Sequence, residues 1–216
     1  LFTPDWIVRY MVENSLGRLW VEGHPDAKAQ LLPTPEEQAA YTAGNRDPED
    51  TKWHYYLEEA QQELQVQAQL SEIRKQYADL TPEQIKVIDP CCGSGTLLVE
   101  RAKLMGHRDL VGVDIASEAV SIARKNIKAS GESVEILGGD LQKFRPRAPF
   151  DELIANLPFG TRVGTHEANS NLYAALFERL PQLLSPKGVA LLYTTQRAPM
   201  LRLARANGWK LLGERR

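Results

Sequence analysis

From Thr81 onward, short apolar runs alternate with stretches of helical spacing, and this alternation restricts the fold more than any other feature. Apolar strands that alternate with helices form parallel sheets, because each helix returns the chain across the sheet in a right-handed crossover. We therefore predict an α/β fold with a doubly wound, mostly parallel sheet. The expected strands are 86–88, 110–113, 134–137, 153–155 and 189–193, and the expected helices are 96–103, 118–129, 171–184 and 200–207.

The first 80 residues have a different pattern and predict a helical N-terminal extension. Thr3 can cap a helix, and apolar residues at helical spacing extend this helix over 3–20. Thr34 and Glu37 have the spacing of a capping box and mark a further helix start. An apolar stripe predicts a longer helix over 52–80.

The change of pattern gives the expected domain organisation, with an extension over 1–80 and an α/β domain over 81–216. A final apolar run, 209–212, begins just before the end of the chain. Open sheets of this kind often finish with an antiparallel edge hairpin, and only the first half of one is found here. We therefore expect a domain that is truncated at the C-terminal edge of its sheet.

Composition and cysteine usage exclude several classes of protein. The chain has 43% hydrophobic and 25% charged residues and a net charge of -2, as ordinary globular proteins do. It has no apolar run of about 18 residues and no signal-peptide pattern, so we expect a cytoplasmic protein without a membrane partner. Cys91 and Cys92 are adjacent and the four histidines are scattered. This arrangement leaves neither a disulfide framework nor a zinc-ligand spacing, so we expect no metal.

A glycine-rich loop follows the first expected strand and precedes an expected helix. Gly93 and Gly95 allow positive φ and a close approach of the main chain to a ligand. Open α/β sheets bind ligands at the carboxyl ends of their strands, which is where this loop lies. A dinucleotide-binding loop would have another glycine where Leu98 stands, so a pyrophosphate ligand is disfavoured. The whole segment reads Asp89-Pro90-Cys91-Cys92-Gly93-Ser94-Gly95-Thr96.

Acidic residues follow the next two expected strands. Asp114 lies 19 residues beyond Gly95, a spacing that suits a carboxylate accepting hydrogen bonds from both ribose hydroxyls. Asp140 follows the third strand and is placed to accept a hydrogen bond from the exocyclic amine of adenine. The three strand ends together therefore predict a nucleoside-binding site.

This set of residues resembles the class I S-adenosylmethionine-dependent methyltransferases, over about residues 86–212. The resemblance implies a Rossmann-like fold and S-adenosylmethionine as cofactor. Asp89, Gly93 and Gly95 would hold its methionine and ribose part, Asp114 the ribose and Asp140 the adenine. We interpret the two cysteines as small loop residues rather than as a redox pair or a nucleophile. The remaining expected cofactor contacts on these loops are Pro90, Cys91, Thr96, Ile115 and Leu141.

The fourth expected strand ends in Asn156-Leu157-Pro158-Phe159-Gly160, a pattern that suits methylation of an exocyclic amine on a base. Such an amine is a poor nucleophile because its lone pair is delocalised into the ring. The Asn156 side-chain oxygen and the Leu157 carbonyl can accept its N–H groups, and transfer then depends largely on positioning. Pro158 stiffens the turn, and Phe159 offers a face on which the base can stack. These four are the predicted catalytic residues, and Asn156 is also an expected cofactor contact.

The same turn and the residues after it resemble the guanine-N2 RNA methyltransferases that accompany THUMP domains. The resemblance continues through 161–166 and 171–173. It implies tRNA or rRNA as the favoured substrate, with Phe159, Gly160, Arg162 and His166 as substrate-binding residues. For Arg162 and His166, an ordinary surface-loop role is the alternative interpretation.

Residues 1–95 instead resemble the adenine-N6 DNA methyltransferases of the BREX phage-defence type. In that family a Thr-Pro turn folds over the methionine end of the cofactor, which implies the same role for Phe2, Thr3 and Pro4. The usual Asn-Pro-Pro-Tyr of that family is changed here, because Leu157 replaces the first proline and Phe159 the tyrosine. DNA methylation at adenine N6 is therefore the alternative function.

Neither a THUMP domain nor a DNA target-recognition domain can be identified in the sequence. This leaves room for a separate recognition domain or subunit that docks the nucleic acid. It also leaves a third interpretation, in which the chain is a catalytically silent module that binds the cofactor or nucleic acid without turnover.

Overall fold

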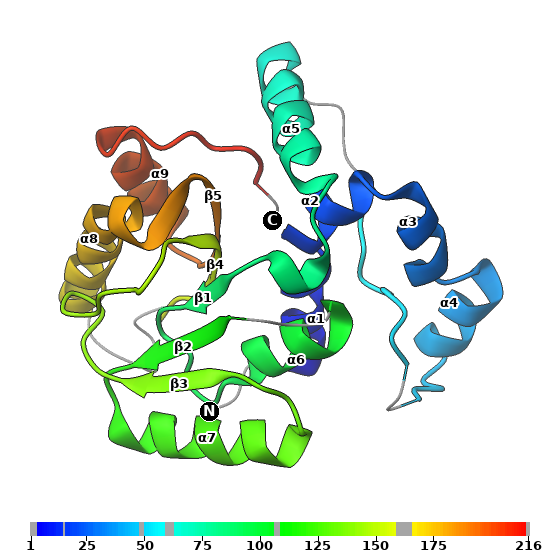
Figure 1. The fold of residues 1–216 in the computed structure, drawn as a ribbon, viewed down its shortest axis with the longest axis horizontal. Helices are drawn as coiled ribbons and strands as arrows, with labels where there is room; N and C mark the ends of the chain where they lie inside the picture. Colours follow the sequence, from blue (N-terminus) through cyan, green and yellow to red (C-terminus); the bar gives the residue numbers. More distant parts are fainter. Residues whose placement is uncertain are drawn as a thin grey trace.

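The computed structural model describes residues 4–14, 16–47, 50–58, 63–105, 109–158 and 166–214 (Figure 1). Five strands in these ranges form one sheet in the order β3-β2-β1-β4-β5. All four strand pairings are parallel, which confirms the α/β prediction. The strands are β1 (Val87–Asp89), β2 (Leu110–Asp114), β3 (Glu135–Gly138), β4 (Phe150–Asn156) and β5 (Leu184–Tyr193).

The chain changes direction across the sheet after β3. It runs outward from β1 through β2 to β3, and then returns to the other side of β1 to form β4 and β5. The carboxyl ends of β1 and β4 therefore lie side by side. After β1 the chain continues toward β2, and after β4 it continues toward β5, on the opposite side. Such a switch point is where open α/β sheets bind their ligands.

Helices cover both faces of the sheet, as expected for a doubly wound fold (Figure 1). The two faces follow from the alternation of side chains along each strand. Ile154 of β4 belongs to the hydrophobic cluster on the first face, whereas its neighbours Leu153 and Ala155 belong to the cluster on the second. The first cluster includes side chains of α6 (Thr96–Met105) and α7 (Ser117–Ser130), and the second includes those of α8 (His166–Leu183) and α9 (Arg197–Ala206).

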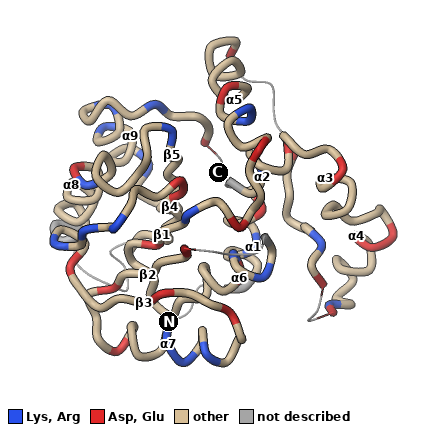
Figure 2. Tube along the Cα trace, viewed as in Figure 1, with Lys and Arg blue, Asp and Glu red and all other residues tan. Residues whose placement is uncertain are grey.

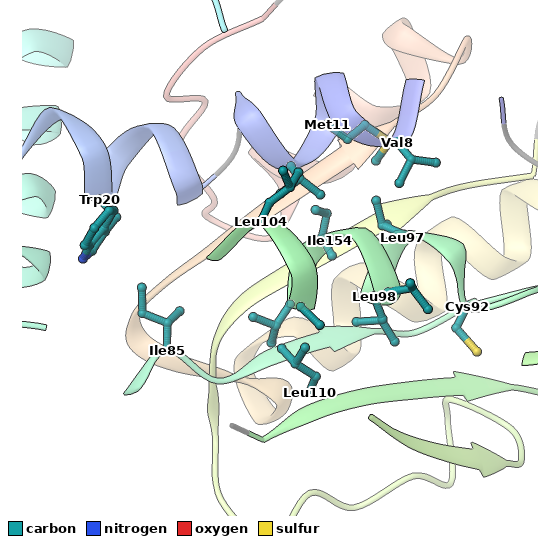
Figure 3. Packing of buried hydrophobic residues seen from close by; sticks show 14 of the residues in the cluster. Val8, Met11, Trp20, Ile85, Cys92, Leu97, Leu98, Leu104, Leu110 and Ile154 are labelled. Carbon is teal, nitrogen blue, oxygen red and sulfur yellow. The ribbon is translucent and has the colours of Figure 1, made fainter. Parts of the chain in front are cut away.

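The N-terminal residues are helical, and α1 (Asp5–Glu13) packs against α6. Val8 and Met11 of α1 face Leu97 and Leu104 of α6 in the first cluster (Figure 3). The expected capping box is confirmed, because the Thr34 hydroxyl accepts from the Glu37 N–H at 3.2 Å and the Glu37 carboxylate from the Thr34 N–H at 2.7 Å. The other helices here are α2 (Leu16–Glu22), α3 (Pro25–Leu31), α4 (Pro35–Thr42) and α5 (Leu64–Tyr77).

The prediction of one helix over 3–20 was wrong, because α1 ends before Asn14. The Asn14 side-chain amide donates to the carbonyls of Tyr10 (3.0 Å) and Tyr55 (2.7 Å). Its oxygen accepts from the Leu57 N–H at 2.9 Å. Asparagine side chains that bond the backbone in this way compete with helix continuation.

The prediction of a helix over 52–80 was also wrong in its first part, because α5 begins only at Leu64. Residues 50–58 contain no helix and pack against the preceding helices. Trp53 is buried and its backbone N–H donates to the Leu31 carbonyl at 2.9 Å. The Tyr55 N–H donates to the buried Glu13 carboxylate at 2.6 Å. These partners come from distant parts of the chain, so local periodicity could not reveal them.

The stability of this N-terminal packing is expected to depend on pH through Glu13. Burial raises the pKa of Glu13 from 4.5 to about 8, so the folded state favours the protonated carboxyl. The stabilisation is complete below pH 4.5 and is lost as the pH rises through about 8. The free energy of unfolding should therefore fall by up to about 1.4 kcal/mol per pH unit between these values.

Urea unfolding at pH 5 and pH 8 measures this dependence, with Glu13→Gln as the comparison because glutamine imitates the protonated acid. We expect the variant to have a flatter pH dependence than the wild type. A Glu118→Gln variant, changed at an exposed position, is the control. Parallel pH dependences for wild type and Glu13→Gln would contradict the assignment.

The strand expected over 209–212 is absent from the described part of the chain. The end of α9 accounts for the difference, because the Gly208 N–H donates to the Arg205 carbonyl and the Trp209 N–H to the Ala204 carbonyl. With Gly208 at φ +74°, this is the Schellman pattern that closes a helix. Trp209 packs against the second cluster instead of extending the sheet. No helix in the described ranges combines the length and the apolar character needed to cross a membrane.

Candidate active site

The glycine-rich loop leaves β1, is bonded to the end of β2 and opens α6. The Cys92 N–H donates to the Val113 carbonyl at 3.0 Å, and the Gly93 N–H to the Asp114 carboxylate at 2.9 Å. Within the loop, the Gly95 N–H donates to the Cys92 carbonyl at 2.7 Å. These bonds fix the loop across the carboxyl ends of two neighbouring strands.

The two loop glycines have different roles, although both have positive φ (+51° at Gly93 and +75° at Gly95). A Cβ on Gly95 would lie 3.2 Å from the Cβ of Ala123, so this glycine allows α6 and α7 to pack closely. A Cβ on Gly93 would meet nothing within 4 Å. Gly93 therefore leaves open space in front of the loop, where a ligand can approach the main chain.

Asp89 and Asp114 lie at the carboxyl ends of adjacent strands but differ in environment. Asp89 is 2% exposed and accepts from the Cys91 N–H at 3.2 Å. Burial, with a contribution from the Asp114 charge, raises the pKa of Asp89 to about 7. Asp114 is half-buried, and its two oxygens accept from the N–H groups of Gly93 and Ala116, each at 2.9 Å. A carboxylate has about four acceptor positions, so Asp114 retains capacity for further donors.

The end of β3 lies beside Asp114, because the Gly139 N–H donates to the Asp114 carbonyl at 2.9 Å. Asp140 is half-buried and accepts from the Gln142 N–H at 2.9 Å. Ile115 is 77% exposed, whereas Leu141 is buried in the second hydrophobic cluster. The structure thus brings together the acidic residues expected from the three strand ends, with an exposed apolar side chain beside them.

The remaining loop residues have local roles in the structure. Pro90 is buried, and the hydroxyl groups of Ser94 and Thr96 are 2.8 Å apart. Both cysteines are free thiols. Burial raises the pKa of Cys92 to about 12 and that of Cys91 well above its usual value, so both remain protonated. The described residues contain no group of three or more His, Cys, Asp or Glu that could hold a metal ion.

The Asn156 turn is next to the glycine-rich loop, as the switch point requires. The Cys91 sulfur lies 3.8 Å from the Asn156 carbonyl oxygen, which joins the two loops. Leu157 is buried, and its N–H donates to the Tyr193 carbonyl of β5 at 3.0 Å. The candidate catalytic turn and the candidate ligand loop therefore form one continuous site at the carboxyl edge of the sheet.

Two residues of α8 hold this turn and were missed by the sequence analysis as site residues. Asn169 donates to the Pro158 carbonyl at 3.2 Å, and the Tyr173 hydroxyl donates to the same oxygen. Both side chains are buried, at 5% and 2% exposed. Their spacing of four places them on one helix face, but this spacing is common and Asn169 preceded the expected helix.

Several expected site residues lie outside the described part of the chain. These are Phe2, Thr3, Phe159, Gly160 and Arg162, together with the side chain of His166.

Pro4 is described and is exposed at the start of α1. Figure 3 shows α1 and α6 running in the same direction, and the Arg9 and Glu100 side chains join them at 3.8 Å. The Pro4 end of α1 therefore lies toward the glycine-rich loop, as a cofactor-covering turn requires.

The fold and this site define a methyltransferase domain. The profile of the RMKL-like methyltransferase domain family (UPF0020) matches residues 59–216, and the chain belongs to this family. Its relatives include enzymes of both kinds that the sequence resembles.

The chain is 43% identical over 100 residues to the adenine-specific methyltransferase BrxX of Escherichia coli, covering 46% of this chain and 6% of that protein. It is 34% identical over 148 residues to the tRNA (guanine(6)-N2)-methyltransferase of Thermus thermophilus, covering 66% of this chain and 43% of that protein. The crystal structure of SMU.472 complexed with SAH is similar, with a TM-score of 0.49 and 21% sequence identity. The match covers 66% of this chain and 47% of that chain. The chain spans less than half the length of each of these proteins.

Proposed function

We propose that this chain catalyses methyl transfer from S-adenosylmethionine to an exocyclic amine of a nucleic-acid base, with guanine N2 of tRNA or rRNA as the first candidate. The observation that carries the proposal is the position of the Asn156 turn beside the glycine-rich loop at the switch point. This position supports the proposal, because it would set a nucleoside-binding loop beside a turn with two acceptors for the amine.

The residues of the loop fit the cofactor. Gly93 leaves room for its close approach, and Asp114 retains acceptor capacity for the ribose hydroxyls. The buried Asp89 suits the amino group of the methionine part, because a cation there stabilises the ionised carboxylate. The exposed Ile115 offers an apolar surface for the adenine, and Asp140 an acceptor for its amine. When bound, S-adenosylmethionine supplies a methyl group on a positively charged sulfonium.

In the proposed reaction the Asn156 turn orients the amine. The Asn156 side-chain oxygen and the Leu157 carbonyl accept its N–H groups and direct its lone pair toward the methyl group. Phe159 would stack on the base, and Arg162 or His166 would contact its edge or a phosphate. The amine loses its proton to solvent after transfer, so a general base is not needed.

Two observations support guanine N2 in RNA. The turn and the residues that follow it resemble the THUMP-associated enzymes, and a tRNA (guanine(6)-N2)-methyltransferase is similar over 66% of the chain. Adenine N6 in DNA is the second candidate, because the identity to BrxX is higher, at 43%, over a shorter segment of 100 residues. In either case, we propose that a separate domain or subunit docks the nucleic acid.

The test is transfer of a labelled methyl group from S-adenosylmethionine to unmodified tRNA and to unmethylated duplex DNA in parallel. The products are digested and the methylated nucleoside is identified. N2-methylguanosine from tRNA is the expected result, and N6-methyladenine from DNA would establish the second candidate. Cofactor binding without methylation of either nucleic acid would contradict both and indicate a silent binding module.

Tyr173 is expected to be a positioning residue for this reaction. Tyr173→Phe removes one of the two donors that hold the Pro158 carbonyl, at a cost of about 1 kcal/mol for a buried hydrogen bond. We expect kcat to fall by about fivefold, while the KM for S-adenosylmethionine is unchanged.

Steady-state kinetics with varied cofactor separates kcat from KM for this variant. Asn171→Ala, which changes an exposed residue of the same helix, is the control and should match the wild type. A rise in the cofactor KM equal to the fall in kcat would mean that Tyr173 acts on the whole site rather than on the turn.

A further inference from the structure

Three arginines line a shallow pocket on the second face of the molecule, away from the glycine-rich loop. The pocket has a volume of about 550 Å³ and lies between the segment that precedes β4 and the C-terminal part of α8. Figure 2 shows blue segments gathered beside α8. The pocket is lined by Arg145, Pro146, Arg147, Ala148, Pro149, Arg179 and Gln182.

The hydrogen bonds of these arginines go to neutral acceptors. Arg145 donates to the carbonyls of Gln142 and Phe144, both at 2.9 Å. Arg179 donates to the Phe144 carbonyl at 2.5 Å and to the Gln182 side chain. Within the described ranges, no ion pair joins Arg145, Arg147 or Arg179 to a carboxylate, and the adjacent Glu178 is exposed.

The position of Arg179 is electrostatically unfavourable in the free protein. Burial and the nearby Arg145 charge lower the pKa of Arg179. Its Nε atom is buried and has no hydrogen-bond acceptor among the described residues. An anion in the pocket would offset this cost, because guanidinium groups form paired, charge-assisted hydrogen bonds with phosphate oxygens.

The pocket is connected to the candidate catalytic turn through α8. This helix holds the turn through Tyr173, and Arg179 follows six residues later on the same helix. The pocket lies at the start of β4 and Asn156 at its end, so seven residues separate Pro149 from Asn156, about 23 Å along a strand, and a stacked nucleic-acid strand advances about 3.4 Å per nucleotide. A nucleic-acid strand with its target base at Asn156 would therefore reach the arginines after about seven nucleotides.

We propose that Arg145, Arg147 and Arg179 bind backbone phosphates of the RNA strand, about seven nucleotides from the base that is methylated. This proposal rests on the proposed function and extends it from the base to the backbone. The pocket contributes affinity without reading sequence, because phosphate contacts position a strand but do not specify bases.

The test uses a fluorescent single-stranded RNA of 12 nucleotides and measures its binding to the whole chain by anisotropy at several salt concentrations. The Arg145→Gln, Arg147→Gln double variant removes two exposed charges. We expect affinity to fall by about tenfold near 0.1 M salt and the salt dependence to decrease by about 1.4 in log–log slope, for two lost phosphate contacts. Affinity for S-adenosylhomocysteine should not change.

The matched control is Lys75→Gln, Arg197→Gln, which removes the same charge from two ion pairs elsewhere, with Glu72 and Glu214. We expect its RNA affinity to stay within about twofold of the wild type, since paired surface charges contribute little. Equal weakening and equal salt slopes in the two double variants would overturn the proposal. Binding of duplex DNA but not RNA through these arginines would overturn the proposal that the bound strand is RNA. Arginine-dependent RNA binding without methyl transfer would support this site while contradicting the proposed function.

Discussion

Replacing Asn156 by alanine is expected to reduce methyl transfer by about 10²–10³-fold, the usual effect of removing one preorganised hydrogen-bonding group from an active site. The variant lacks the side-chain oxygen that would accept an N–H of the target amine. The Leu157 carbonyl alone then orients the amine, and its lone pair no longer points reliably at the methyl group. Affinity for S-adenosylhomocysteine should change by no more than about fivefold, because a single neutral hydrogen bond of about 1 kcal/mol is the most that is lost.

Single-turnover methylation and calorimetric titration of S-adenosylhomocysteine measure the two quantities separately. Asn207→Ala, at an exposed position after α9, is the control for asparagine replacement and should resemble the wild type. Asn156→Asp keeps an acceptor oxygen and should retain more activity than alanine. A loss of cofactor affinity as large as the loss of turnover would contradict the proposed role of Asn156 in orienting the amine.

The α/β part of the fold could be predicted because its signals are local. Each of the five strands contains a short apolar run, and the order of strands and helices restricts the topology. The N-terminal part was predicted less well because its backbone is held by distant side chains. Glu13 and Asn14 bind the N–H groups of Tyr55 and Leu57 across more than 40 residues.

The candidate site shows the same division between local and distant signals. Asp89, Asp114 and Asn156 could be found because each directly follows an apolar run that becomes a strand. The separate roles of Gly93 and Gly95 could not, since they depend on how closely Ala123 of α7 approaches the loop. Asn169 and Tyr173 were missed for a related reason, because only the folded chain places α8 against the Pro158 carbonyl.

Replacing Asp114 by alanine is expected to weaken binding of S-adenosylhomocysteine by at least about 100-fold. The carboxylate holds the Gly93 and Ala116 N–H groups, each at 2.9 Å, and would also accept the ribose hydroxyls. Hydrogen bonds to a charged group contribute about 1.5–3 kcal/mol each, so loss of two such bonds to the ribose is sufficient for this effect. Release of the Gly93 N–H would loosen the loop as well, and turnover at saturating cofactor should fall less than affinity.

Calorimetric titration checks this expectation, with Glu118→Ala as the control because that exposed carboxylate lies on α7, beyond the loop. The pair of Asp114→Ala and Asn156→Ala then separates the two halves of the site. Asp114 would act in cofactor binding and Asn156 in orienting the amine. The Asp114 variant should therefore lose mainly affinity for S-adenosylhomocysteine, and the Asn156 variant mainly turnover. If the two variants lose affinity for S-adenosylhomocysteine equally, the loop and the turn act as one binding surface and the division of roles is wrong.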